Sequence, residues 1–358
     1  MIRSNPRTGP GRARAGAVGR LLAAVALVLP LTGCAALLGE QRIGPGVALP
    51  SASSSTKPST AARPAAAGTS DAFSPYDVRP LLRPAKKILG IAAEGAPNSM
   101  TAVADFTAKA GKTPNLIEYY SGWGDDFDTK GARNAWESGA IPLVAWEPYT
   151  MTLADIAAGK GDDYIKRYAW AVRDFNAPVA ISFAHEMNGF WYEWGTKHAT
   201  AEEFVAAYRH IHDLFSEIGA ASVIWVWSPN SVNPTKGVQL QPYYPGDNYV
   251  DWVGIVAYYT HLEAGTFDTL YTPTLTQIRA FTDKPFLIAE TGAEPGARKR
   301  NDILNLAGGV LARPDCLGFV WFNIRKEADW RIDSDPQALA AFKQIAADSR
   351  FGFDVKSP

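Results

Sequence analysis

The chain has 358 residues, of which 47% are hydrophobic and 20% are charged, and its formal net charge at pH 7 is −1. This composition is typical of a globular protein, and the small net charge gives no electrostatic reason to expect nucleic acid as a partner. Neither a Walker-type loop nor a G-x-G-x-x-G turn occurs, which argues against a nucleotide-binding enzyme. The 11 Trp and 14 Tyr fit either a large aromatic core or a binding cleft with aromatic walls.

The first 34 residues have the features of a lipoprotein signal peptide. Several arginines precede the apolar segment 21–31, which is too short for a permanent membrane helix of about 20 residues. The segment ends in Leu31-Thr32-Gly33-Cys34, which resembles a bacterial lipobox, where the cysteine becomes the lipidated first residue. We therefore expect a lipid anchor at Cys34 and an extracytoplasmic, membrane-anchored protein. The alternative is an ordinary cleaved signal peptide in which Cys34 has no role.

Residues 35–72 are rich in Ala, Pro, Ser and Thr and contain few large apolar side chains. Such a segment cannot bury enough surface to offset its loss of conformational entropy, so the sequence predicts a disordered linker. The chain has two cysteines, and lipidation of Cys34 leaves Cys316 without a partner. We expect Cys316 to be a buried thiol in a fold without disulfide bonds.

Residues 73–358 are predicted to form a single (β/α)8 TIM barrel. Short apolar segments recur eight times with segments of helical periodicity between them, as expected for parallel strands buried on both faces. The predicted strands are 87–92, 115–120, 141–146, 179–184, 222–227, 251–258, 285–289 and 317–322. A doubly wound open sheet is the alternative, but it usually has fewer strands and a glycine-rich first turn.

Two glutamates follow predicted strands at their carboxyl ends, where TIM barrels carry their catalytic residues. Glu186 follows the fourth strand and Glu290 the seventh, so both are expected at the mouth of one barrel. Hydrolysis of a glycosidic bond uses two carboxyl groups, one that protonates the leaving oxygen and one that attacks carbon or activates water. Glu147, after the third strand, is predicted to be structural or peripheral to this site.

Three segments of this region resemble glycoside hydrolase family 26. Residues 185–195 (HEMNGFWYEWG) resemble its fourth-strand signature, residues 284–292 (KPFLIAETG) its seventh-strand nucleophile motif, and residues 320–323 (VWFN) its eighth strand. The resemblance extends from Tyr76 to Phe353. The family contains mostly endo-β-1,4-mannanases, with some lichenase-type β-glucanases and β-1,3-xylanases.

The resemblance implies a retaining, endo-acting hydrolase of a β-linked polysaccharide, with Glu186 as general acid/base and Glu290 as nucleophile. It implies that His185 binds near the nucleophile and that Tyr258 contacts it. Trp191 and Trp321 are implied as walls of the sugar site. Separately, Trp123 follows the second strand and is expected to line a distal part of the cleft.

The substrate is expected to be β-1,4-mannan, because most of the family acts on it. The loops 121–128, 147–153 and 228–246 are expected to determine which polysaccharide is bound. In the last of them, Asn230, Asn233, Tyr243 and Tyr244 are possible sugar contacts. A lichenase-type β-glucanase or a xylanase with the same mechanism is an alternative. A lipoprotein that binds glycans without cutting them is another, although a binder does not need a paired acid and nucleophile.

No metal or organic cofactor is expected, and the protein is expected to be a monomer. The segment Asp126-x-Asp128-x-Lys130 resembles a calcium-binding loop, but Lys130 places a cation where a ligand oxygen belongs. His210 and His212 are two residues apart on a predicted helix, so they do not share one face.

Overall fold

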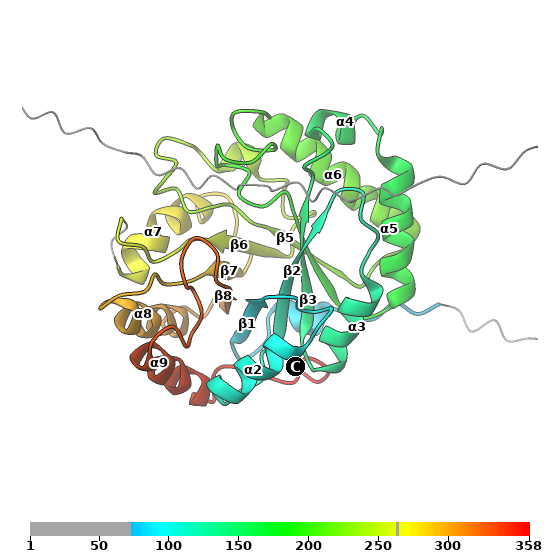
Figure 1. Cartoon of the computed structure of the whole chain (residues 1–358). Coiled ribbons are helices and arrows are strands. Elements are labelled where there is room, and N and C mark those ends of the chain that lie inside the picture. The colour runs from blue at the N-terminus through cyan, green and yellow to red at the C-terminus, as the bar shows by residue number, and fades with distance from the viewer. Residues whose placement is uncertain (1–72, 263–264) are drawn as a thin grey trace, which may run out of the picture. The chain divides into compact units, whose positions relative to one another are not determined.

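Eight parallel strands close into a barrel in the computed structural model, which describes residues 73–262 and 265–358 (Figure 1). Neighbouring strands in the chain are neighbours in the sheet, and β8 pairs with β1. The predicted (β/α)8 barrel is confirmed, and the open-sheet alternative is wrong. The strands are β1 (Ile88–Ala93), β2 (Leu116–Gly122), β3 (Ile141–Glu147), β4 (Val179–Phe183), β5 (Val223–Trp227), β6 (Trp252–Val256), β7 (Phe286–Thr291) and β8 (Cys316–Asn323).

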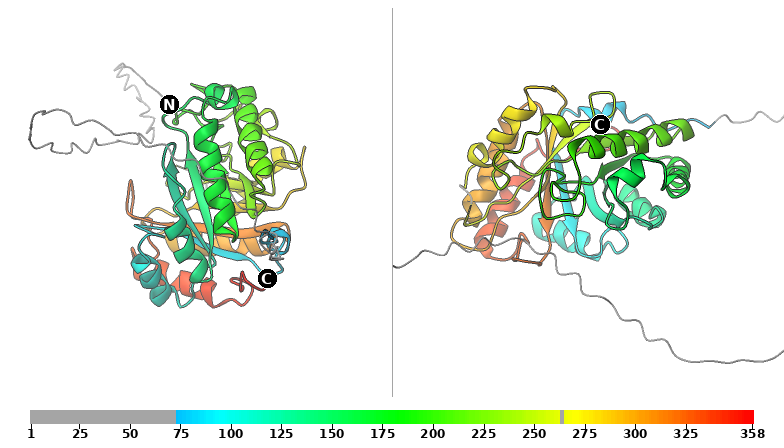
Figure 2. Two further views of the ribbon diagram at one scale, coloured as in Figure 1. Left: turned by 90° about the vertical axis from the view of Figure 1, so that its right-hand side faces the viewer. Right: turned by 90° about the horizontal axis from the view of Figure 1, so that it is seen from above.

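The helices lie outside the ring of strands, as the views in Figure 1 and Figure 2 show. They are α1 (Arg79–Leu82), α2 (Thr101–Ala110), α3 (Thr129–Glu137), α4 (Leu153–Ala157), α5 (Asp162–Phe175), α6 (Ala201–Ile218), α7 (Phe267–Ile278), α8 (Lys299–Leu311) and α9 (Pro336–Ala347), with the short 3-10 helix η1 (Gln241–Tyr243). Capping residues in the sequence mark where helices begin and end. Thr200 and Glu203 form a capping box that starts α6, and Gly219 ends it with a φ of 77°.

Two groups of apolar side chains build the core. Alternate strand residues such as Leu89 and Ile117 pack outward against the helices, while Ile88, Leu116 and Leu143 pack inside the barrel. The inner group also contains side chains of α1, and the Trp252 ring nitrogen donates to the Leu82 carbonyl. Since these contacts involve the first residues of the strands, α1 closes the amino end of the barrel. Polar side chains lie at the carboxyl end of the barrel.

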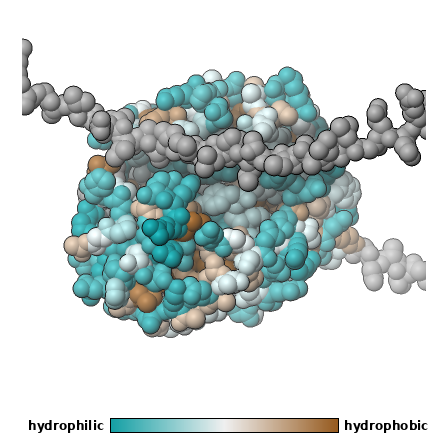
Figure 3. Space-filling model, viewed as in Figure 1, coloured by the Kyte–Doolittle hydropathy of each residue, from teal (hydrophilic) through white to brown (hydrophobic). Residues whose placement is uncertain are grey.

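The surface facing the viewer in Figure 3 is mostly hydrophilic, with hydrophobic residues scattered over it. No helix within the described residues is long and apolar enough to cross a membrane. Cys316 is a buried free thiol, as predicted, and burial raises its pKa to about 12. The predicted signal peptide, Cys34 and the linker all lie outside the described residues.

Candidate active site

Glu186 lies just beyond β4 in a strained backbone segment. Ala184 and Glu186 have φ angles of 49° and 56°, a region that side chains other than glycine rarely adopt. The Glu186 amide donates to the carbonyl of Ser228, beyond β5, at 2.7 Å. Its side chain is buried and accepts hydrogen bonds from the Trp191 ring nitrogen at 2.7 Å and from the Asn230 amide. These contacts hold the strained segment and aim one carboxyl group into the barrel mouth.

Glu290, within β7, is held by two phenols. The Tyr120 hydroxyl, from β2, donates to one carboxylate oxygen and the Tyr258 hydroxyl, beyond β6, donates to the other. Strand pairing is irregular on both sides of β7, near Val256 and between Ile288 and Thr291. Such irregularities re-aim side chains at barrel rims. Two donors on one carboxylate stabilise its ionised form.

The two carboxyl groups have contrasting electrostatic environments. Burial, followed by the negative charge of Glu290, raises the pKa of Glu186 to about 7, against the opposing hydrogen bonds from Asn230 and Trp191. Burial also raises the pKa of Glu290, but the hydrogen bonds from Tyr120 and Tyr258 act against that rise. Near neutral pH this arrangement favours a protonated Glu186 beside an ionised Glu290.

Two further carboxyl groups share this end of the barrel. Burial is the main cause that raises the pKa of Glu147 to about 7, and the charge of Glu290 adds to it. Burial and the charges of Glu290, Glu147 and Glu186 raise the pKa of Glu118, of which one oxygen is buried without a hydrogen-bond partner. Four glutamates therefore interact here, and Glu147 belongs among them rather than at the periphery.

His185 is a buried, neutral neighbour of these groups. Burial lowers its pKa to about 4, and its Nε2 lies 3.3 Å from the Tyr192 hydroxyl and 4.0 Å from the Glu147 carboxylate. The Trp194 ring nitrogen donates to its carbonyl at 2.7 Å. His185 thus lies at the barrel mouth, as expected, and its Nδ1 is buried without a hydrogen-bond partner.

The predicted aromatic walls fall in different places. Trp191 is half-buried and bonded to Glu186. Trp123 is half-buried and stacks on Trp146, with 5.3 Å between the ring centroids. Trp321 is fully buried and packs against Phe342 of α9, so the expectation that it forms a wall of the sugar site is corrected. Its pairing register explains this, because Trp321 lies opposite Ile91, which also points outward to the helices.

Of the possible contacts in the loop after β5, Asn230 reaches the site through its bond to Glu186. The Asn233 amide donates instead to the carbonyls of Thr269 and Leu270. Tyr244 is bonded to Asp247 and Thr282. These two side chains are therefore engaged away from the carboxyl groups.

A cavity of about 450 Å³ opens at the carboxyl ends of β1 and β2. Its lining includes Glu94, Glu118, Tyr120, Asp125 and Asp126. Since Tyr120 is bonded to Glu290, this cavity adjoins the carboxyl groups. Sequence analysis missed Glu118 and Tyr120, although their spacing of two at the end of one strand places both on its inward face.

Among the described residues, no group of three or more His, Cys, Asp or Glu side chains could hold a metal ion. Asp128, in the calcium-like segment, instead caps α3 by accepting from the Gly131 amide. His210 Nε2 lies 2.6 Å from Asp162 of α5. These groups therefore have structural roles in helix contacts.

Comparison with known proteins identifies the domain. Residues 161–331 match the family model described as glycosyl hydrolase family 26. Over 264 residues the chain is 33% identical to Endoglucanase H of Acetivibrio thermocellus, an alignment that covers 70% of this chain and 29% of that protein. The chain carries a glycoside hydrolase family 26 domain. The expected family resemblance is thereby confirmed.

Relatives of this family 26 domain carry several activity names. A β-1,3-xylanase of a Vibrio species is 27% identical over 165 residues, covering 43% of this chain and 35% of that protein. A mannan endo-1,4-β-mannosidase of Bacillus subtilis is 31% identical over 127 residues, covering 33% of this chain and 32% of that protein. This chain spans about a third or less of the length of these relatives.

Solved structures share the fold of the family 26 domain. A β-mannanase from Bacteroides ovatus is 19% identical with a TM-score of 0.56, and the alignment covers 76% of this chain and 92% of that one. A mannanase from Cellulomonas fimi is 16% identical with a TM-score of 0.58, covering 76% of this chain and 73% of that one. At this identity the likeness concerns the fold alone.

Proposed function

We propose that this glycoside hydrolase is a retaining, endo-acting enzyme in which Glu290 is the nucleophile and Glu186 the general acid/base. The observation that carries the proposal is the contrast between the two carboxyl groups. Both carboxylates accept a hydrogen bond on each oxygen, from two phenols at Glu290 and from Trp191 and Asn230 at Glu186. The charge of Glu290, however, adds to burial in raising the pKa of Glu186 to about 7, whereas the two phenols oppose the rise at Glu290. An enzyme that needs one acid and one nucleophile at neutral pH requires this difference.

The proposed reaction has two displacements. Glu290 attacks the anomeric carbon while the proton of Glu186 passes to the leaving glycosidic oxygen, which gives a glycosyl ester on Glu290 and frees one end of the chain. The ionised Glu186 then takes a proton from water as that water attacks the anomeric carbon, which restores Glu290. His185, being neutral, can hydrogen-bond a sugar hydroxyl, and Trp191 and Trp123 offer partly exposed rings.

Three substrates are proposed for the same site. The relative that matches over 70% of this chain is named an endoglucanase, which favours a β-glucan. Relatives named mannan endo-1,4-β-mannosidases match over shorter segments, as that of Bacillus subtilis does over 33% of the chain, which keeps β-1,4-mannan as the second candidate. A β-1,3-xylan follows from the Vibrio relative.

The test is release of reducing sugar from lichenan, mannan and β-1,3-xylan by the purified protein, with Glu290→Ala as control. We expect release from one polysaccharide, loss of release in the variant, and retention of the anomeric configuration in the first product seen by NMR. Inversion would refute the double displacement. A folded protein that binds these glycans without cutting any of them would support the binding alternative.

We also propose that Cys34 is lipidated and anchors the protein on the outer side of a membrane. The proposal is based on the lipobox-like segment alone. Expression in a bacterial host with labelled fatty acid tests it, since Cys34→Ser would lose both label and membrane association. An unlabelled wild-type protein would show that the signal peptide is of the ordinary cleaved kind.

A further inference from the structure

A short hairpin follows β8 at the carboxyl end of the barrel. Arg325 and Asp329 form an antiparallel bridge, the Lys326 amide donates to the Ala328 carbonyl, and the Trp330 amide donates to the Ile324 carbonyl. We call residues 324–330 the β8 hairpin. Its residues Lys326 and Glu327 act electrostatically on Glu290, so the hairpin borders the active site.

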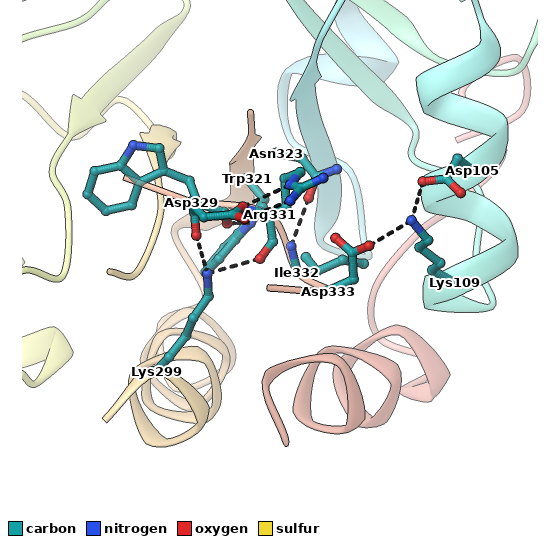
Figure 4. A network of polar contacts seen from close by, with 10 residues as sticks. Asp105, Lys109, Lys299, Trp321, Asn323, Asp329, Arg331, Ile332 and Asp333 are labelled. Atoms are coloured by element: carbon teal, nitrogen blue, oxygen red, sulfur yellow. Dashed lines mark hydrogen bonds and ion pairs between the residues drawn. The ribbon is translucent and has the colours of Figure 1, made fainter. Parts of the chain in front are cut away.

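Lys299, the first residue of α8, fastens the base of this hairpin (Figure 4). It is fully buried, and its ammonium group donates to the carbonyls of Asp329 and Arg331, both at 2.9 Å. These two carbonyls flank Trp330. The carbonyl of Trp330 itself accepts from the Trp321 ring nitrogen at 2.9 Å. Three successive carbonyls are thus held by buried donors from α8 and β8.

The held residue, Trp330, supports one of the phenols on the nucleophile. Its ring is buried and lies 4.7 Å from the Tyr258 ring. Gly292 leaves room for this contact, because a Cβ there would lie 3.1 Å from Trp330 and 3.2 Å from Tyr258. Tyr258 in turn donates to Glu290. A continuous set of contacts therefore runs from Lys299 through Trp330 and Tyr258 to Glu290.

We propose that Lys299 is a positioning residue for catalysis: by holding the carbonyls of Asp329 and Arg331 it fixes Trp330 against Tyr258 and keeps the Tyr258 hydroxyl on Glu290. This inference rests on the proposed role of Glu290 as nucleophile. Lys299 touches neither substrate nor reacting atoms and acts through two aromatic rings.

Fold stability alone does not account for this lysine. Burial lowers its pKa to about 8, and a buried charge with a lowered pKa weakens the folded state at neutral pH relative to an exposed lysine. What the ammonium group supplies in return is several donors on one atom, which a neutral aliphatic side chain cannot provide. Lys299 therefore contributes by fixing the position of Trp330, the residue that packs on Tyr258.

Several ionisable groups face Glu290 besides Tyr258. They are Tyr120 and Glu118 on β2, Glu147 on β3, Glu186 beyond β4, and Lys326 and Glu327 on the β8 hairpin. Loss of the Tyr258 bond removes one of the two donors that oppose the raised pKa of Glu290. The acid limb of the pH profile should then move to higher pH, a change that a purely structural role of Lys299 would not cause.

The test is the kinetics of Lys299→Met in the intact chain, with lichenan and mannan as substrates. We expect kcat to fall about tenfold while KM stays within about twofold, because the change affects the nucleophile rather than sugar binding. In a Tyr258→Phe background, Lys299→Met should reduce kcat by less than about twofold further, since the two residues act in series. Additive losses, or an unchanged kcat and acid limb, would overturn the inference.

Two other variants keep the test decisive. Lys109→Met is the matched control, because Lys109 pairs with Asp333 beyond the hairpin and with Asp105, and it should leave kcat and the pH profile unchanged. Trp321→Phe deletes the donor to Trp330 without unpairing a buried charge, so it tests the same contact if Lys299→Met does not fold. It should lower kcat in the same direction, and an unaltered kcat there would count against the inference.

Glu290→Ala separates the two proposals. If it is inactive while Lys299→Met has wild-type kinetics, the proposed function stands and the inference on Lys299 fails. If Glu290→Ala keeps its activity, the role of Glu290 fails and that of Lys299 fails with it.

Discussion

The two ends of this barrel are built from the same alternation of inward side chains and serve opposite purposes. On β2 the inward residues change from Leu116 to Glu118 and Tyr120 along the strand, and on β3 from Leu143 to Glu147. The amino end is apolar and closed by α1, whereas the carboxyl end holds four interacting glutamates. On these two strands the apolar inward residues and the polar ones are thus separated by about 13 Å or less, at about 3.3 Å per residue.

The largest effect should come from removing the proposed nucleophile. Glu290→Ala is expected to lower kcat by about 10⁴-fold or more, because the covalent step has no other attacking group. The free energy of unfolding should not fall, since the change removes a desolvated charge. Kinetics on the responsive polysaccharide together with thermal unfolding measure both. A large loss of stability would contradict the view that the carboxyl end carries the chemistry and the amino end the stability.

A change at the amino end should do the reverse. Leu116→Ala removes a fully buried side chain from the inner core and should lower the free energy of unfolding by about 2–5 kcal/mol. The kcat of the folded enzyme should stay the same. Urea unfolding measures the first quantity, and Leu262→Ala, at a side chain that is 67% exposed, is the matched control, with a change within about 0.5 kcal/mol.

Glu118 should make stability depend on pH. Its pKa in the folded state is raised, so its neutral form is favoured by folding, and the associated stability is complete below the unfolded pKa and is lost as pH rises through the folded pKa. Glu118→Gln should therefore weaken the fall in stability above pH 5. Thermal unfolding across pH 4–8 measures it, with the exposed Glu94→Gln as control. An identical pH dependence in Glu118→Gln would show that Glu118 does not contribute.

The smallest effect concerns Glu186, the proposed acid. With the pKa of Glu186 near 7, kcat/KM should fall as pH rises through about 7, because the acid loses its proton. The Asn230 amide favours the ionised form, so Asn230→Ala should raise that pKa and move the basic limb to higher pH. Asn233→Ala, whose amide is bonded to Thr269 and Leu270, should not move it.

Sequence patterns predicted the barrel because its eight strands are short apolar segments that need no long-range information to recognise. They also placed Glu186 and Glu290 at strand ends, where the structure has them. Trp321 shows the limit of that reasoning. A position near a strand end does not show whether a side chain points into or out of the barrel. That Trp321 points outward to α9 became clear only from its pairing with Ile91.

Tyr120 and Trp330 were missed for a different reason. Tyr120 contacts Glu290 across 170 positions in the chain, and Trp330 lies beyond the last strand in a segment without periodicity. Their roles arise from barrel closure, which brings β2 and the β8 hairpin to the same rim. The substrate also stayed unpredicted, because loops after the strands decide among sugars that differ in single hydroxyl groups.

The origin of the two phenols bears on how readily such an enzyme is re-engineered. Tyr120 belongs to β2 and Tyr258 follows β6 by two residues, so the groups that hold Glu290, the proposed nucleophile, come from the barrel rather than from long loops. Loops grafted after β3 or β5 would alter which sugars enter the site while Glu290 stays held by the two phenols. The β8 hairpin is the exception, because exchanging it would also exchange the support of Tyr258. Engineering of new specificities should therefore begin with the loops after β3 and β5 rather than with the β8 hairpin.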